Sequence, residues 1–298
     1  AAVDRLIGGL GNDTLLSDGG DDILIGGEGD DSLQIVDVSF AGTRRLDGGL
    51  GTDTLALTGS GLTLDLTAIA DNRLQELEII DLTGSGANTL TLDLQEVLNL
   101  SGHSNTLTVL RNSDDVVHDG GGWTQSADEV VSGVRYKVFT QGAATLKIEN
   151  VAPIATADVN STTEDAAVNG NVLTDGTPDS DPDDDASTLT VTEVNGIAAD
   201  VGTEITLASG ALLTVNADGS YTYDPNGQFE PLNLLGSTTD TFTYAISDPG
   251  GLTSTATVTV TIDGVNDAPV AAGNQYDTNE SEPVTGNLLT DGTPDSDV

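Results

Sequence analysis

Large apolar residues near the start of the chain recur at a fixed interval of nine positions. An aspartate stands two positions before each of them. The apolar series is Leu6, Leu15, Leu24 and Leu33, and the aspartate series is Asp4, Asp13, Asp22 and Asp31. This period predicts a stack of tight turns, each followed by a short strand whose apolar residue faces the interior.

Glycines complete the repeat as G-G-x-G-x-D-x-U-x, where U is a large apolar residue. Complete units occupy positions 8–16, 26–34 and 48–56, and the unit at 17–25 has Ser17 and Asp18 in place of the first two glycines. Glycine permits the positive φ angles of tight turns, and such turns direct backbone carbonyls inward beside the aspartate. Calcium takes six to eight oxygen ligands from carboxylates and carbonyls. The sequence therefore predicts several bound calcium ions, with the alternative of Gly-Asp surface turns without metal. The candidate ligands are Asp4, Gly8, Gly9, Gly11, Asp13, Gly20, Asp22, Gly26, Gly27, Gly29, Asp31, Gly48, Gly49, Gly51 and Asp53.

The middle of the chain alternates in short strand-like segments separated by Gly-Ser turns. The predicted strands are 55–58, 62–67, 77–82, 90–94 and 107–110. Helical spacing over 66–77 predicts a short helix between two strands, and Leu94, Val97 and Leu98 predict another turn of helix. We expect a roll over residues 1–58 that continues as a β-solenoid over 59–150. A hairpin formed by 136–140 and 145–149 is expected to cap it.

From Pro153 onward, Thr, Val, Asp and Asn dominate and apolar residues alternate with period two. Clear examples are 188–193, 212–216, 220–223, 240–246 and 254–262. About seven short strands over ~100 residues predict an Ig-like β-sandwich. The segment NVLTDGTPDSD at 171–181 returns as NLLTDGTPDSD at 287–297, a period of 116 residues. We therefore expect one module at 151–268, the start of a second at 269–298, and a chain that is a segment of a longer tandem array.

The charge is strongly acidic, with 49 Asp and Glu against 8 Lys and Arg and a net charge of −41. Like charges repel in a compact state unless cations neutralise them. Because 37% of the residues are apolar and regularly spaced, we expect an ordered fold with bound cations rather than disorder. No basic patch is present to contact phosphates, so nucleic-acid partners are not expected. No apolar run is long enough for membrane insertion, and the absence of cysteine fits a secreted protein stabilised by metal.

Catalytic motifs are scarce. The only histidines are His103 and His118, and neither lies in an H-E-x-x-H motif. His118 is interpreted as a solvated loop residue. Glu76 and Glu78 stand at strand spacing as a solvated pair, a calcium contact or, least favoured, an acid–base pair. Trp123 is interpreted as hairpin core, with a sugar-stacking platform as the alternative. We expect no enzyme in this chain.

The nonapeptides resemble the calcium-binding repeats of RTX (repeats-in-toxin) proteins, which form a parallel β-roll. In that family two nonapeptides make one coil, and each ion lies between turns 18 residues apart. The resemblance implies that Asp13 and Asp31 share one edge of the roll, and that Asp4 and Asp22 share the other.

The C-terminal module resembles the bacterial cadherin-like repeats called VCBS-type. The resemblance rests on GNVL at 170–173, NADGSYTY at 216–223, TFTY at 241–244 with Ser247 and Asp248, and DGVNDAP at 263–269. The last motif is similar to the linker at which cadherins bind calcium. It implies Asp263, Asn266 and Asp267 as ligands, with Glu164 as a further carboxylate. The acidic run at 179–185 is interpreted as either a calcium loop or an exposed acidic loop.

Together the resemblances imply an all-β fold, a parallel β-roll or β-solenoid followed by an Ig-like (cadherin-like) β-sandwich. They imply a calcium-dependent structural or adhesive segment of a large bacterial surface protein, exported by type I secretion. The alternatives are a secretion-associated region of an RTX hydrolase or toxin, or a subunit of an extracellular fibre or surface layer. A carbohydrate, a protein and a second copy of the chain all remain open as adhesion partners.

Overall fold

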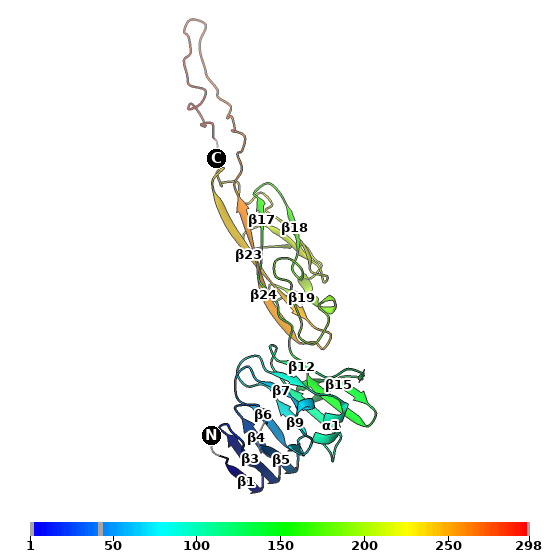
Figure 1. The fold of residues 1–298 in the computed structure, drawn as a ribbon. Helices are drawn as coiled ribbons and strands as arrows, with labels where there is room; N and C mark the ends of the chain where they lie inside the picture. Colours follow the sequence, from blue (N-terminus) through cyan, green and yellow to red (C-terminus); the bar gives the residue numbers. More distant parts are fainter. Residues whose placement is uncertain (1–2, 41–43, 297–298) are drawn as a thin grey trace. The chain divides into compact units, whose positions relative to one another are not determined.

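The computed structural model describes residues 3–40 and 44–296 of the chain, and these residues are almost wholly strands and turns (Figure 1). They divide into two compact units, described separately below. Unit 1 is Ala1–Ala152 with Pro182–Asp184, and unit 2 is Pro153–Asp181 with Asp185–Val298. Residues 1–2, 41–43 and 297–298 lie outside the described residues. They include Asp297, the last residue of the repeated segment at 287–297.

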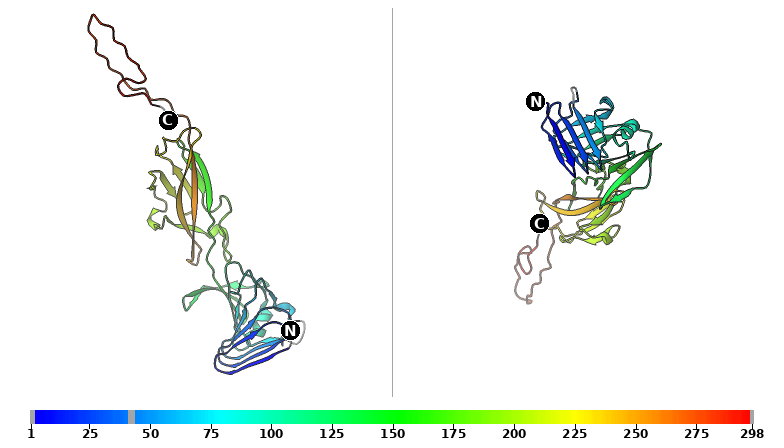
Figure 2. Two further views of the ribbon diagram at one scale, coloured as in Figure 1. Left: turned by 90° about the vertical axis from the view of Figure 1, so that its left-hand side faces the viewer. Right: turned by 90° about the horizontal axis from the view of Figure 1, so that it is seen from below.

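Unit 1 is a parallel solenoid whose strands stack coil upon coil (Figure 2). Its strands are β1 (Arg5–Leu10), β2 (Thr14–Ser17), β3 (Ile23–Glu28), β4 (Ser32–Ile35), β5 (Arg45–Leu50), β6 (Thr54–Leu57), β7 (Thr63–Asp65), β8 (Leu74–Gln75), β9 (Ile79–Asp81), β10 (Thr89–Thr91), β11 (Thr106–Leu110), β12 (Val116–His118), β13 (Thr124–Gln125), β14 (Glu129–Val131), β15 (Val134–Gln141) and β16 (Ala144–Glu149). One sheet has the order β1-β3-β5-β8, and a larger one runs β2-β4-β6-β9-β11-β16-β15-β13, with β14 also paired to β15. A third sheet has the order β12-β10-β7.

The nine-residue apolar series is divided between the two large sheets. Every second member pairs in register with the next coil, so that Leu6 lies beside Leu24 and Leu15 beside Leu33. The columns continue to Leu46 and to Leu55. From Leu24 onward these leucines are fully buried. Each such side chain contributes about 1.5–3 kcal/mol when it leaves water, so the two columns form the core of the roll.

One helix prediction is wrong and the other is confirmed. Residues 66–77 form only a short 3₁₀ turn, Leu66–Ala68, and then strand β8, because Leu74 pairs with Leu46 of β5 and continues the column. Short apolar runs fit a helix or a strand equally, and the neighbouring coil decides between them. Helix α1 forms at Leu94–Leu100, where the side chain of Asp93 accepts hydrogen bonds from the first turn.

The end of the solenoid carries the predicted hairpin. Strands β15 and β16 pair antiparallel, and β16 also pairs parallel with β11. Trp123 packs against the core, and its indole N–H donates to the carbonyl of Asp119 at 2.7 Å. The interpretation of Trp123 as a core residue therefore holds.

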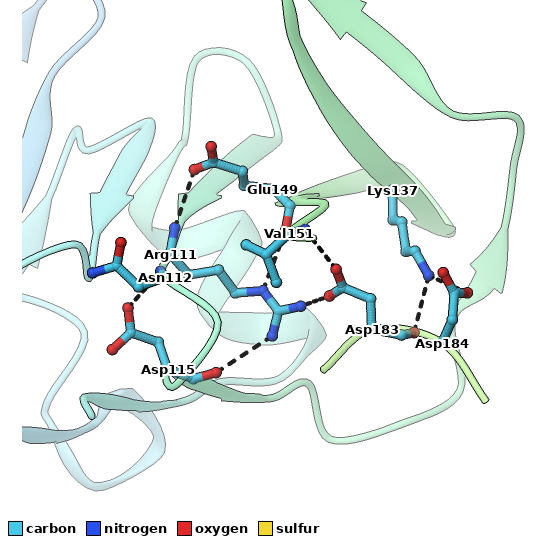
Figure 3. A network of polar contacts seen from close by, with 8 residues as sticks. All are labelled: Arg111, Asn112, Asp115, Lys137, Glu149, Val151, Asp183 and Asp184. Carbon is cyan, nitrogen blue, oxygen red and sulfur yellow. Dashed lines mark hydrogen bonds and ion pairs between the residues drawn. The ribbon is translucent and has the colours of Figure 1, made fainter. Parts of the chain in front are cut away.

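Residues Pro182–Asp184 of the acidic run belong to unit 1. There the buried, positively charged side chains of Arg111 and Lys137 form ion pairs with them (Figure 3). Arg111 forms an ion pair with Asp183, and Lys137 forms one with Asp184 at 2.5 Å. A second oxygen of Asp183 accepts the backbone N–H of Val151 at 2.7 Å. This part of the run is neither an exposed loop nor a cluster of bare carboxylates, because the chain supplies its own positive charges.

Unit 2 is a sandwich of two four-stranded sheets. Its strands are β17 (Asp158–Thr163), β18 (Val168–Asn171), β19 (Thr190–Val194), β20 (Ile205–Thr206), β21 (Leu212–Val215), β22 (Ser220–Asp224), β23 (Ser237–Ser247) and β24 (Thr253–Asp263), with 3₁₀ turns at Ala186–Thr188 and Ala198–Asp200. The sheets are β17-β24-β23-β19 and β18-β22-β21-β20, and they share one core. Tyr221 of one sheet meets Phe242 of the other edge to face, with ring centroids 5.4 Å apart. The residues after β24 carry no strand among those described, and Val270 bridges to Ser296.

Candidate metal centre

A ladder of carboxylates runs along one edge of the roll. The backbone N–H of Asp13 donates to Asp31 Oδ1 at 2.8 Å, and that of Asp31 donates to Asp53 Oδ1 at 2.8 Å. The N–H of Asp53 then donates to Glu78 Oε2 at 2.9 Å. The carboxylates of Asp31, Asp53 and Glu78 are thereby held in place by the preceding coil, and each has one oxygen already satisfied.

The second oxygen of three of these carboxylates has no partner. Oδ2 of Asp13, Asp31 and Asp53 is buried without a hydrogen bond. Asp31 is 2% exposed and Asp53 is 0% exposed. A buried, unpaired carboxylate oxygen is costly unless a cation meets it. Three such oxygens in a row, with no donor beside them, fit calcium and fit poorly with Gly-Asp turns that bind no metal.

The first glycine of each repeat leaves the space that this arrangement needs. A Cβ on Gly26 would lie 2.2 Å from Asp31 Oδ2 and 2.3 Å from the carbonyl oxygen of Gly48. The carboxylate oxygen and the carbonyl of the next coil therefore converge on one point. The second and third glycines serve the turn itself, as φ is +126° at Gly27 and +124° at Gly29.

The electrostatics of the ladder also call for a cation. Burial, together with the charges of Asp31, Glu78 and Asp30, raises the pKa of Asp53 to about 6. Burial likewise raises the pKa of Glu78 above its ordinary value. Like charges held together away from water favour a bound proton or a bound metal, and a divalent ion neutralises two carboxylates at once.

The opposite edge of the roll is built differently. The N–H of Asp4 donates to Asp22 Oδ1 at 2.9 Å, and the Ser17 hydroxyl donates to Asp22 Oδ2 at 2.6 Å. Carboxylate oxygens of Asp4, Asp18 and Asp22 lie within 4.8 Å of one another. Asp18, which replaces a glycine of the motif, therefore adds a carboxylate that the motif does not include. Gly20 keeps a positive φ of +109°.

A second acidic group lies at the end of β24 in unit 2. Carboxylate oxygens of Asp165, Glu230 and Asp267 lie within 4.8 Å of one another. Glu164 is 1% exposed; its Oε1 accepts the N–H of Val265 at 2.7 Å. Its Oε2 and Oδ2 of Asp267 are both buried without a partner. Partial desolvation raises the pKa of Glu230, and the charges of Asp267, Asp165 and Glu164 raise it further.

Of the three ligands predicted from the linker motif, only Asp267 is one of the clustered carboxylates. Glu164, predicted as a further carboxylate, adjoins Asp165 of the group, and the side chains of Asp263 and Asn266 are exposed. Asp263 contributes its backbone, since its carbonyl accepts the N–H of Glu164 at 3.1 Å. Asp165 and Glu230 were not predicted. Asp165 adjoins Glu164 in the sequence, but no motif marks Glu230.

The histidines lie on the surface. His103 Nδ1 is 2.6 Å from Glu76 Oε2, and the His103 side chain is 70% exposed. Glu76 has a φ of +50°, and its carbonyl faces Gly48 in the position of a glycine carbonyl of the earlier coils. His118 is exposed at the end of β12, not in a loop. Among the described residues, no helix is long and apolar enough to cross a membrane.

Two family models match parts of the chain. The model of the RTX calcium-binding nonapeptide repeat (4 copies) matches residues 1–33, and that of the bacterial cadherin-like domain matches residues 150–264. The comparison with curated proteins finds no match. Among solved structures, the chain is similar to protocadherin gamma B2 extracellular cadherin domains 1–5, with 20% identity and a TM-score of 0.26. That match covers 50% of this chain and 29% of the other.

Proposed function

Because the chain carries RTX calcium-binding nonapeptide repeats followed by a bacterial cadherin-like domain, we propose that it is a calcium-dependent structural and adhesive segment of a large secreted bacterial surface protein. Both domain types bind calcium and are typical of extracellular proteins. The observation that carries the proposal is the row of unpaired, buried oxygens on Asp13, Asp31 and Asp53.

In the roll, calcium is the counter-charge that permits folding. The ligands we propose are the predicted aspartates and glycine carbonyls, with Asp18 and Glu78 added by their positions on the two edges. The unfolded chain holds no such site, so the free energy of binding calcium becomes free energy of folding. A chain of net charge −41 stays extended where calcium is scarce and folds where it is abundant. That behaviour suits export by type I secretion before folding.

In the cadherin-like domain, calcium held by Glu164, Asp165, Glu230 and Asp267 stiffens the segment that follows β24. Residues 265–267 lead directly out of the sandwich, so an ion bound there limits rotation about them. A stiff series of such modules holds an adhesive surface away from the cell. The segment acts without catalysis, and its partner is a carbohydrate, a protein or another copy of the chain.

The proposal is tested on the full chain by thermal unfolding in calcium and in excess chelator. We expect the transition of unit 1 to fall sharply or vanish in chelator, and to return when calcium is restored in excess. Identical transitions in both conditions would contradict the proposal. Binding to a glycan array with and without calcium tests the adhesive role. Equal binding in both conditions would show that adhesion does not depend on calcium.

A further inference from the structure

The sandwich of unit 2 contains a group of buried oxygens apart from the acidic group at the end of β24. It gathers around the hydroxyl of Tyr244, a residue of β23 that is 1% exposed. The Tyr244 oxygen lies 2.9 Å from the carbonyl of Thr156 and 3.0 Å from that of Val172. It is also 3.5 Å from Asp158 Oδ2, and 3.3 and 3.2 Å from the two oxygens of Asp179.

This environment has too few donors for its acceptors. The Tyr244 hydroxyl carries one proton, yet two carbonyls and two carboxylates lie within 3.5 Å of it. Only one of them can receive that proton. Asp179 gains one further donor, the N–H of Thr156, which lies 2.7 Å from its Oδ1. The remaining oxygens face one another, and such an arrangement is favourable only around a positive charge.

Asp158 supplies the clearest sign of a missing partner. It is 3% exposed, and its Oδ1 is buried without a hydrogen bond. That oxygen faces the turn at Gly176, where an added Cβ would lie 3.1 Å away. Asp179 is also 3% exposed, so two carboxylates lie in the interior within reach of one hydroxyl.

We propose that Asp158 and Asp179, with the carbonyl of Val172 and the hydroxyl of Tyr244, bind a calcium ion inside the sandwich. All of these groups are oxygen ligands of the kind that calcium prefers. The ion would join the start of β17, the end of β18 and the loop before Ser180 to the middle of β23. It therefore acts within the domain, independently of the roll and of the group at the end of β24.

The next repeat supplies a natural substitution at this position. One period of 116 residues onward, Asn274 stands in place of Asp158, while Asp295 corresponds to Asp179. The local contacts are otherwise alike, because Asp295 Oδ1 accepts the N–H of Ala272 at 2.7 Å. Asn274 has no charge, so the second repeat lacks half of the carboxylate pair. Asp158→Asn is therefore the residue difference that the two repeats show at this position.

The test counts the calcium ions bound to the full chain at neutral pH, by equilibrium dialysis and elemental analysis. We expect Asp158→Asn to bind one ion fewer than the unaltered chain. Asp277→Asn makes the same chemical change at an exposed position of unit 2 and is expected to bind the unaltered number. Equal numbers for Asp158→Asn and the unaltered chain would overturn the proposal, and would assign the balancing charge to a proton.

A second measurement does not depend on folding of the Asp158 variant. Terbium replaces calcium at oxygen sites, and its emission is sensitised by a tyrosine in contact with it. Tyr244→Phe keeps both carboxylates, so we expect it to lose a large part of the tyrosine-sensitised emission. Unchanged emission would overturn the placement of the ion. Neither result depends on the roll, so chelation could leave unit 1 unchanged and contradict the proposed function while these measurements still support the site.

Discussion

The backbone N–H of Asp53 donates to Glu78 Oε2 at 2.9 Å, so a glutamate occupies the next rung of a ladder that aspartates form in the earlier coils. The spacing along this ladder grows from 18 residues to 22 and then to 25. A longer side chain compensates for a coil that has lost its nonapeptide length. The carboxylate ladder therefore extends one coil beyond the last complete repeat.

Whether Asp53→Asn stabilises or destabilises unit 1 is expected to depend on calcium. Asp53→Asn removes a buried negative charge that lies beside Asp31 and Glu78. In chelator the variant is expected to be at least as stable as the unaltered chain, because repulsion falls. At calcium near 100 times the dissociation constant of the site it loses up to about 2.7 kcal/mol of binding-linked stability. Chemical unfolding of unit 1 in both conditions measures this, and a loss of equal size in chelator would contradict a metal role.

A methyl group at Gly26 is expected to abolish the adjacent site. The Cβ of Gly26→Ala would lie 2.2 Å from Asp31 Oδ2, so the carboxylate has to move. We expect weaker calcium binding and a lower melting temperature in calcium. Gly133→Ala is the control, because Gly133 has open space around it and only a positive φ of +89°. If both variants bind calcium equally well, the steric argument is wrong.

Glu96 is expected to make unit 1 less stable as the pH rises. Burial, together with the charges of Asp71, Asp93 and Asp65, raises the pKa of Glu96 from 4.5 to about 7. A raised folded-state pKa stabilises the fold below pH ~4.5, and that stability is lost as the pH rises through about 7. Glu96→Gln is expected to remove this loss, so its melting temperature gains on the unaltered chain between pH 5 and pH 8. Asp114→Asn, an exposed change in the same unit, is expected to show no such gain.

The ion pair of Arg111 and Asp183 is expected to be essential to unit 1. Their side chains are 5% and 2% exposed, so Asp183→Ala leaves a buried guanidinium without its carboxylate. Breaking a buried pair in this way costs about 3–5 kcal/mol. Glu129→Ala breaks the more exposed pair with Lys147 and is expected to cost about 1 kcal/mol or less. Denaturant unfolding compares the two, and equal losses would contradict the assignment.

The structure and the linker motif point to different calcium ligands after β24: the structure points to Glu230, and the motif points to Asp263. Glu230→Gln is expected to weaken calcium binding in unit 2, because Glu230 lies with Asp165 and Asp267. Asp263→Asn is expected to have little effect, since that carboxylate is not one of the three that lie together. Calcium titration compares the affinities of the two variants. A larger loss of affinity in Asp263→Asn than in Glu230→Gln would contradict the structural assignment and favour the ligands of the linker motif.

The sequence predicted those parts of the fold that repeat with a fixed period. The phase shared by Leu6, Leu15, Leu24 and Leu33 gave the core of the roll, and alternation gave the strands of the sandwich. What it missed lies where the period breaks. Asp18 looked like a lost glycine, and the strand at Leu74 is fixed by its pairing with Leu46 rather than by local spacing. For Glu78 the sequence offered a calcium contact as one alternative, and its position on the ladder comes from the hydrogen bond with Asp53.

Glu230 and the pair Asp158–Asp179 could not be predicted for a different reason. Residues distant in sequence meet there because two sheets close on each other, and no local spacing encodes that meeting. Asp179 was noticed only as part of an acidic run. The fold divides this run, placing Asp179 in the sandwich interior and Asp183 beside Arg111.

The carboxylate ladder has a consequence for how sharply the roll responds to calcium. Asp31 is oriented by Asp13 on one side and by Asp53 on the other, so an ion that orders one rung also orders its neighbours. Stacked units of this kind behave as a one-dimensional cooperative array. The folded fraction of the roll is therefore expected to rise steeply over a narrow range of calcium concentration. Within that range a small increase in calcium folds the whole roll, starting from the first coil that becomes ordered.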